Sequence, residues 1–263
     1  MAEATATAAI PTYPDLAGKV AVVSGGSKGI GAAACQVLAA NGVKVAVVAR
    51  EQDGIDKVVG SLRDAGGTAV GISTDMVSFA AIEEMRQRVE DELGPVDILM
   101  PFAGGFGKMT PVVDITEEEW DFVISSNLTS TFLTCKSFLP GMIKRGRGAI
   151  VTMASNAARN LDITLTASYA AAKAGIVMFT RHVAKEVGPS GVRVNCIAPA
   201  TTMSERVERV MTPDRIQFMA DLAPLKRIGM PNDSALAALF LVSDSASWLT
   251  GVTLDVAGGR IML

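Results

Sequence analysis

Short β-branched runs alternate along this chain with longer segments of helical periodicity, beginning at Lys19. Such an alternation requires parallel strands joined by crossover helices. The runs VAVV, VAVVA and AIVTM are almost continuously apolar, which indicates strands that are buried on both faces. Seven strands are expected, at 20–23, 43–48, 68–72, 98–100, 149–153, 192–197 and 253–256.

The segments between these strands predict the helices of the same domain. The sequence predicts one α/β domain: a Rossmann-type, doubly wound fold with a seven-stranded parallel sheet and helices on both faces. This domain is expected to span 16–263, after a flexible tail at 1–15 that lacks the pattern of a secretory signal. Helices are expected at 30–40, 79–93, 120–145, 168–187 and 234–242.

One region, at about 199–231, interrupts the alternation with methionines and charged residues between the last two strands. Connections of this length are usually functional or mobile, so we interpret it as a substrate loop inserted into the domain. The alternative is a helical excursion that only covers the sheet.

Composition and charge narrow the classes of partner. Hydrophobic residues make up 49% of the 263 residues and charged residues 19%, which is typical of a compact globular protein. The formal net charge of −3 argues against nucleic acid or an anionic membrane as the main partner. No apolar run approaches the ~20 residues of a membrane span, so no membrane insertion is expected. A small-molecule partner fits better.

Cysteine and histidine usage bears on location and metal binding. The three cysteines Cys35, Cys135 and Cys196 are far apart, which indicates reduced thiols in a cytoplasmic protein. His182 is the only histidine and has no Cys or His neighbour at ligand spacing, so no metal site is expected.

A glycine-rich turn, SGGSKGIG at 24–31, directly follows the first predicted strand. Its glycines Gly25, Gly29 and Gly31 allow the backbone to approach a phosphate closely, and the amides of the next helix would face that phosphate. A tight turn needs glycine in any case. The position of the turn within a βαβ unit is therefore what predicts a dinucleotide site.

The end of the second predicted strand indicates which dinucleotide binds. The run VVAR at 47–50 lacks the carboxylate that would accept hydrogen bonds from the adenosine ribose of NAD. Arg50 offers a planar, permanently charged fork for a phosphate, and Lys28 adds a second cation. We therefore predict NADP(H), with solvated surface charges as the alternative. Asp75, after the third strand, would suit the adenine amino group or cap a helix.

Four side chains form the candidate catalytic group. Tyr169 and Lys173 are four residues apart in a predicted helix, so they share one face, where the ammonium would lower the phenol pKa. Ser155 follows the fifth strand, at the sheet edge where such folds bind ligands, and could donate to a substrate oxygen. Asn127 is a mediocre helix former within a predicted helix.

These motifs, in this order, resemble the short-chain dehydrogenase/reductase family over about 16–259, and most resemble its carbonyl and 3-oxoacyl-carrier-protein reductases. The resemblance is carried by SGGSKGIG, AG at 103–104, Asn127, Ser155, YAAAK at 169–173, VRVNCIAP at 192–199 and LDVAGG at 254–259.

The resemblance implies roles for these residues. Tyr169 donates a proton to the carbonyl oxygen, Lys173 binds the nicotinamide ribose, Ser155 orients the carbonyl, and Asn127 holds a water that relays protons. A homotetramer is also implied. The implied cofactor-binding residues are Gly25, Ser27, Lys28, Gly29, Ile30, Gly31, Arg50, Asp75, Met76, Ala103, Gly104, Tyr169, Lys173, Pro199 and Thr202.

The sequence departs from the family pattern in three places. Pro101 and Phe102 replace two asparagines whose amides tie adjacent strands together, and Ala200 replaces a glycine. The segment between Ser155 and Tyr169 carries one extra residue. All four catalytic candidates are retained, but the surroundings of the pocket differ.

Apolar side chains are predicted to line the substrate pocket, which favours a hydrophobic ketone or keto ester over a sugar. The alternative is that these side chains are ordinary core residues. They are Phe106, Met109, Leu161, Ile163, Leu165 and Met203.

Two other functions stay open. One is reduction of a 3-oxoacyl group on an acidic carrier protein, with Arg145 and Lys185 in a basic docking patch. The other is a non-catalytic NADP-binding protein, which would have no physical need for the four catalytic candidates.

Overall fold

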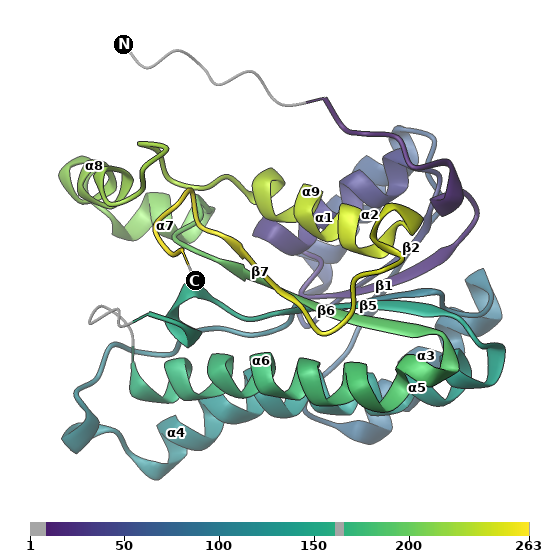
Figure 1. The fold of residues 1–263 in the computed structure, drawn as a ribbon, viewed down its shortest axis with the longest axis horizontal. Coiled ribbons are helices and arrows are strands. Elements are labelled where there is room, and N and C mark those ends of the chain that lie inside the picture. The colour runs from purple at the N-terminus through teal and green to yellow at the C-terminus, as the bar shows by residue number, and fades with distance from the viewer. Residues whose placement is uncertain (1–8, 161–165, 263) are drawn as a thin grey trace.

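The computed structural model of the chain describes residues 9–160 and 166–262, which form one α/β domain (Figure 1). The strands pair in parallel in the order β3-β2-β1-β4-β5-β6-β7. The predicted seven-stranded, doubly wound sheet is confirmed. The strands are β1 (Val20–Ser24), β2 (Lys44–Ala49), β3 (Ala69–Ser73), β4 (Ile98–Pro101), β5 (Gly148–Met153), β6 (Val192–Pro199) and β7 (Thr253–Val256).

Helices cover both faces of the sheet (Figure 1). Successive strand residues point to opposite faces, so Val23 and Val47 join one buried core while Val22 and Val48 join the other. This alternation explains why the strands are apolar throughout. One face carries α1 (Gly29–Ala40), α2 (Gln52–Asp64) and α9 (Pro231–Val242); the other carries α3 (Phe79–Leu93), α5 (Ser130–Arg145) and α6 (Ala167–Val187).

The strand order reverses between β1 and β4, and this reversal positions the site. The connection after β1 leads to β2 on one side, whereas β4 lies on the other side. A crevice therefore opens at the carboxyl ends of β1 and β4, as in other open α/β sheets. β4 pairs with β5 only at Ile98 and Leu99, but with β1 as far as Pro101.

Helix α2 was not predicted from the sequence. Its buried residues Ile55, Val59 and Leu62 do follow helical spacing. Two glycines within the segment, Gly54 and Gly60, weaken the local helical signal. Packing of the three apolar side chains against the sheet overrides that weakness.

The segment predicted as one helix at 120–145 is two helices. α4 (Glu117–Ile124) begins earlier than predicted, because Thr116 caps it by accepting a hydrogen bond from the Glu119 amide at 3.2 Å. A π-helical turn, Ser125–Thr129, then separates α4 from α5. Such turns are frequent at functional sites, and this one contains Asn127.

The predicted loop at 199–231 contains two short helices, α7 (Glu205–Val210) and α8 (Pro213–Asp221). They lie beyond the sheet, near the C-terminal end of the described chain (Figure 1). A small apolar cluster of its own holds this region together; its members are Met203, Ile216, Met219, Ala220 and Ile228.

The predicted tail at 1–15 includes residues that bond to the domain. The Tyr13 amide donates to Asn41 Oδ1 at 2.7 Å, and Asn41 Nδ2 donates to the Pro11 carbonyl at 3.1 Å. Residues 1–8 of that prediction lie outside the described residues. Within the described ranges, no helix has both the length and the apolar character needed to cross a membrane.

Candidate active site

The glycine-rich turn between β1 and α1 brings backbone segments unusually close. A Cβ at Gly31 would lie 2.1 Å from the Gly25 carbonyl oxygen, and one at Gly25 would lie 2.9 Å from the Phe102 carbonyl oxygen. Gly29 has a φ of 53°, which also favours glycine. Lys28, the N-cap of α1, makes no side-chain cap hydrogen bond. The first amides of α1 are therefore available to an anion such as a phosphate.

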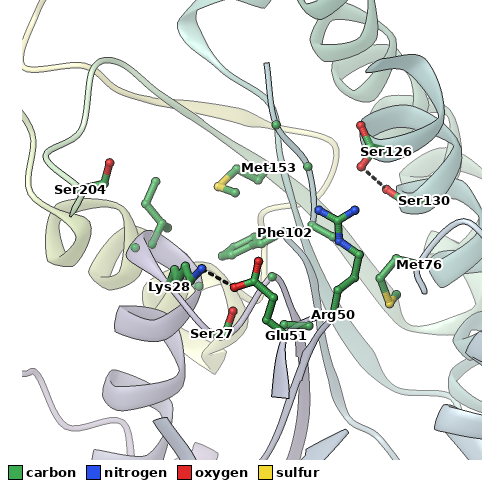
Figure 2. A pocket seen from close by; sticks show the side chains of 18 of the residues that line it. Ser27, Lys28, Arg50, Glu51, Met76, Phe102, Ser126, Ser130, Met153 and Ser204 are labelled. Atoms are coloured by element: carbon green, nitrogen blue, oxygen red, sulfur yellow. Dashed lines mark hydrogen bonds and ion pairs between the residues drawn. The ribbon is translucent and has the colours of Figure 1, made fainter. Parts of the chain in front are cut away.

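A cleft of about 480 Å³ lies over this turn (Figure 2). Its chemistry fits a dinucleotide, because uncapped helix amides and glycine backbone form one wall and two cations stand at one end. Tyr169, Lys173 and Pro199 were also predicted to bind the cofactor, but they are not part of this lining. The predicted residues that line it are Gly25, Ser27, Lys28, Gly29, Ile30, Gly31, Arg50, Asp75, Met76, Ala103, Gly104, Thr202 and Met203.

A carboxylate stands at the cationic end of the cleft, contrary to the sequence interpretation. Glu51 Oε2 lies 2.6 Å from Lys28 Nζ, and both residues line the cleft with Arg50 (Figure 2). The sequence interpretation considered residues only as far as Arg50 and did not include Glu51, although this acidic residue directly follows Arg50 in the sequence. The Lys28 hydrogen bond and charge, followed by the charge of Arg50, lower the pKa of Glu51.

Asp75 lies at the edge of the cleft and does not cap a helix. The N-cap of α3 is Ser78, whose hydroxyl accepts from the Ala81 amide at 3.3 Å. Asp75 Oδ1 instead accepts from the Val77 amide at 3.2 Å, which fixes the turn after β3. The cap interpretation is therefore wrong, and a role toward the adenine stays a prediction.

Tyr169 and Lys173 lie on one face of α6, as the four-residue spacing predicted. Lys173 Nζ is 5.5 Å from the centroid of the Tyr169 ring. It also donates a hydrogen bond of 2.9 Å to the carbonyl oxygen of Met153, which lines the cleft. Thr166 starts α6 by accepting from the Tyr169 amide at 3.3 Å. The cap thus fixes the helix at the residue that carries the phenol.

The pKa of Tyr169 moves in the opposite direction from the sequence expectation. Burial raises this pKa, and a hydrogen bond with Ser155 opposes the rise. Lys173 is itself buried, which lowers its pKa to about 8. Burial of the phenol therefore outweighs the lowering of its pKa that the sequence analysis expected from a neighbouring ammonium.

Ser155 lies where β5 ends, and its hydroxyl is held on several sides. Besides the hydrogen bond with Tyr169, Ser155 Oγ accepts from the Ala157 amide at 3.2 Å and lies 3.2 Å from Asn156 Oδ1. These contacts restrict the rotamer of a side chain that is 7% exposed. Two hydroxyls, Ser155 and Tyr169, therefore converge at the carboxyl edge of the sheet.

Asn127 holds the loop after β4 in place. Its Nδ2 donates to the Gly105 carbonyl at 2.7 Å, and its Oδ1 accepts from the Gly105 amide at 3.3 Å. A Cβ at Gly104 would lie 2.4 Å from Asn127 Oδ1 and 3.6 Å from Lys173 Nζ. Asn127, Gly104 and Lys173 are therefore brought together, and Gly104 connects them to the cleft.

Comparisons with known proteins agree with this arrangement. A family model described as enoyl-(acyl carrier protein) reductase matches residues 25–260. The 3-oxoacyl-[acyl-carrier-protein] reductase of Vibrio cholerae is 36% identical over 95% of this chain and 100% of its own length. The chain belongs to the short-chain dehydrogenase/reductase family.

Other members of the short-chain dehydrogenase/reductase family are similarly close. The D-threitol dehydrogenase of Mycolicibacterium smegmatis is 34% identical over 93% of each chain. A 7α-hydroxysteroid dehydrogenase, solved with NADH and 7-oxo glycochenodeoxycholic acid, has a TM-score of 0.89 and 35% identity. That likeness covers 94% of this chain and 96% of the other. The chain is thus an oxidoreductase of a family acting on alcohol and carbonyl groups, but its relatives differ in the substrates that their names state.

In this short-chain dehydrogenase/reductase, hydrogen bonds to Ser24 join β1 to the segment after β4, where the sequence lacks the two asparagines. Ser24 Oγ accepts from the Ala103 amide at 3.2 Å, and the Phe102 amide donates to the Ser24 carbonyl at 3.2 Å. β1 and the segment after β4 therefore stay joined despite Pro101. Ala200 is accommodated at the end of β6, where its amide donates to the Val256 carbonyl at 3.1 Å.

The predicted substrate pocket is only partly brought together. The Phe106 ring stands edge-on to that of Tyr169, with centroids 6.0 Å apart, and Met203 lines the cleft. Met109 is 70% exposed and is not among the residues that line the cleft. The predicted wall residues Leu161, Ile163 and Leu165 lie outside the described residues.

Within the described part of the chain, no group of three or more His, Cys, Asp or Glu side chains could hold a metal ion. The three cysteines are buried, and burial raises the pKa values of their thiols. Sequence reasoning missed Phe122, Ser126, Ser130, Met153 and Ser204, which line the cleft. Phe122, Ser126 and Ser130 follow one another at four-residue spacing along α4, the π-helical turn and α5, whereas Met153 and Ser204 lie farther along the chain. No motif used in the sequence analysis marks any of the five.

Proposed function

We propose that this chain is an NADP(H)-dependent oxidoreductase that interconverts a ketone or keto ester and an alcohol. The observation that carries the proposal is the convergence of Ser155 and Lys173 on Tyr169, beside the cleft. Two hydroxyls at one edge can both donate to a carbonyl oxygen, which stabilises the charge developing on it. The dinucleotide supplies the hydride when it is bound.

Each residue has a defined task in this proposal. Tyr169 Oη gives its proton to the substrate oxygen, and Ser155 Oγ orients that oxygen. The charged form of Lys173 favours the phenolate that remains on Tyr169. Asn127 keeps Gly104 and Gly105 beside Lys173 through its two hydrogen bonds to Gly105. The predicted water relay through Asn127 stays part of the proposal.

The choice of NADP(H) rests on Lys28 and Arg50, which both line the cleft. A guanidinium and an ammonium together attract a 2′-phosphate. The chain resembles a dehydrogenase solved with NADH, so both nicotinamide dinucleotides are needed in any assay.

The substrate class rests on the surroundings of Tyr169. Phe106 packs edge-on against the phenol ring, and Met203 stands at the cleft, so an apolar substrate is favoured. A 3-oxoacyl group on a carrier protein is the second candidate, favoured by 36% identity to a 3-oxoacyl-carrier-protein reductase. Of the two residues predicted to dock an acidic carrier protein, Lys185 is exposed and available. The Arg145 guanidinium donates to the Val96 carbonyl and is less suited to contact a carrier protein.

Replacing the phenol tests the proposal. Tyr169→Phe should abolish turnover of ketones, keto esters and 3-oxoacyl thioesters, because no proton donor remains, while NADPH binding persists. Turnover is followed by nicotinamide absorbance, and binding by fluorescence titration. Tyr13→Phe, which changes the only other tyrosine, should keep full turnover.

Two results would contradict the proposal. Turnover retained in Tyr169→Phe would remove the role of the phenol. Dinucleotide binding without oxidation of NADPH or NADH by any substrate, enoyl thioesters included, would favour the non-catalytic alternative.

The proposal includes a cytoplasmic homotetramer, as the family resemblance implies. Sedimentation velocity measures the assembly, and a single species of about four chain masses is expected.

A further inference from the structure

The carboxylate of Glu51 forms an ion pair with Lys28, which is one of the two cations in the cofactor cleft. The contact between Glu51 and Lys28 is 2.6 Å long, and the two side chains are 69% and 60% exposed. Glu51 is the N-cap residue of α2, yet its carboxylate makes no cap hydrogen bond to that helix. The carboxylate contacts Lys28 instead.

The backbone holds this pair together. At Gly54, in the first turn of α2, a Cβ would lie 3.1 Å from Ser27 Cβ and 3.8 Å from Lys28 Cε. The start of α2 is therefore in close contact with the glycine-rich turn. Figure 2 shows the Glu51 carboxylate turned toward Lys28, with Arg50 on its other side. The charge of Arg50 also acts on Glu51.

We propose that Glu51 sets the preference between NADPH and NADH by competing with the 2′-phosphate for Lys28. This inference rests on the cofactor site of the proposed function and names a residue that limits its selectivity. NADPH binding would place a phosphate group of about −1.5 to −2 charges beside Lys28 and Arg50. The phosphate would have to displace the Glu51 carboxylate from Lys28, and it would then remain near that negatively charged carboxylate. NADH carries a hydroxyl at that position and meets neither obstacle.

The magnitude of the effect follows from the exposure of the pair. Exposed ion pairs are weak, so the phosphate can displace Glu51 and NADPH can still bind. Repulsion between two anions a few ångströms apart in water-like surroundings corresponds to roughly a three- to tenfold change in affinity. Glu51 therefore reduces the selectivity for NADPH without excluding it.

Equilibrium binding of both dinucleotides to Glu51→Gln tests this inference without turnover. Removing the charge should lower the Kd for NADPH about three- to tenfold and leave the Kd for NADH within about twofold. The gain should shrink when NaCl is raised, because salt screens exposed charges. Glu92→Gln is the matched control, since Glu92 also forms an exposed ion pair, 2.7 Å from Arg88 on α3.

A second variant shows whether Glu51 acts through Lys28. In a Lys28→Gln background, Glu51→Gln should give a smaller gain for NADPH, because the contested cation is gone. Fragments lacking nicotinamide, 2′,5′-ADP and 5′-ADP, should repeat the difference between the dinucleotides.

The failures of the two proposals can be told apart. If the wild type binds NADPH tightly, and Glu51→Gln leaves both Kd values unchanged or changes them by the same factor, the role of Glu51 is overturned and the cofactor site stands. A wild-type chain and a Glu51→Gln variant that bind neither dinucleotide overturn the cofactor site and this inference together.

Discussion

Lys173 is a charged side chain in a place where charge is unfavourable. It is 4% exposed, and its hydrogen bond to the Met153 carbonyl only partly replaces its lost hydration. Burial lowers its pKa from 10.5 to about 8. Stability is thereby reduced at neutral pH, which is expected where a group is retained for its chemistry rather than for folding.

We predict that Lys173→Met removes a pH dependence of stability. Below about pH 8, Lys173 is charged in both the folded and the unfolded chain, and the burial penalty is fully present. Between about 8 and 10.5 the folded chain loses the proton first, so the penalty shrinks as pH rises. Urea unfolding should show wild type gaining about 2 kcal/mol relative to the variant between pH 7.5 and 10.

Lys144→Met serves as the control for that measurement, because Lys144 is exposed on α5. Its stability relative to wild type should not change over the same pH range. A Lys173→Met difference that is equally flat would contradict the burial of the charge.

At the scale of elements, the β1–α1 turn and α2 show opposite uses of glycine. At Gly31, added atoms would meet the Gly25 carbonyl, whereas at Gly60 in α2 nothing lies within 4 Å of an added Cβ. One glycine is required by close backbone approach. The other only weakens a helix.

We predict opposite effects for two Gly-to-Ala changes. Gly31→Ala should destabilise the chain by about 3 kcal/mol and abolish dinucleotide binding, because backbone atoms must move. Gly60→Ala should stabilise it by about 0.5–1 kcal/mol by restricting the unfolded chain. Urea unfolding and NADPH titration measure both. A stable, nucleotide-binding Gly31→Ala would contradict the described turn.

At the scale of the molecule, a partly buried ion pair joins the segment after Ser155 to β7. Arg159 Nη1 lies 3.2 Å from Asp255 Oδ2, and the two side chains are 18% and 16% exposed. Burial raises the pKa of Asp255, and the charge of Arg159 opposes that rise. The pair thus closes a contact between residues almost a hundred positions apart.

We predict that Arg159→Gln costs about 1–3 kcal/mol, because it leaves the partly buried Asp255 carboxylate without its cation. The double variant Arg159→Gln/Asp255→Asn should cost less than the sum of the single changes. Arg88→Gln, which breaks an exposed pair, should change stability by less than about 0.5 kcal/mol. Additive losses in the double variant would show that the two side chains are not coupled.

The sequence by itself determined the strands, the glycine-rich turn and the shared face of Tyr169 and Lys173. Each depends on residues that are close in the chain, so local periodicity and backbone sterics are sufficient to predict it. The family motifs likewise predicted most of the cleft lining. Helix α2 was missed because its local signal is weak and its stability comes from packing.

The tertiary structure alone decided which distant groups meet. Glu51 reaches Lys28, Lys173 reaches the Met153 carbonyl, and burial reverses the expected direction of the Tyr169 pKa. Contacts and desolvation depend on how separate elements pack together. No pattern within a single segment records that packing, because charge and pKa respond to distance in space and not along the chain.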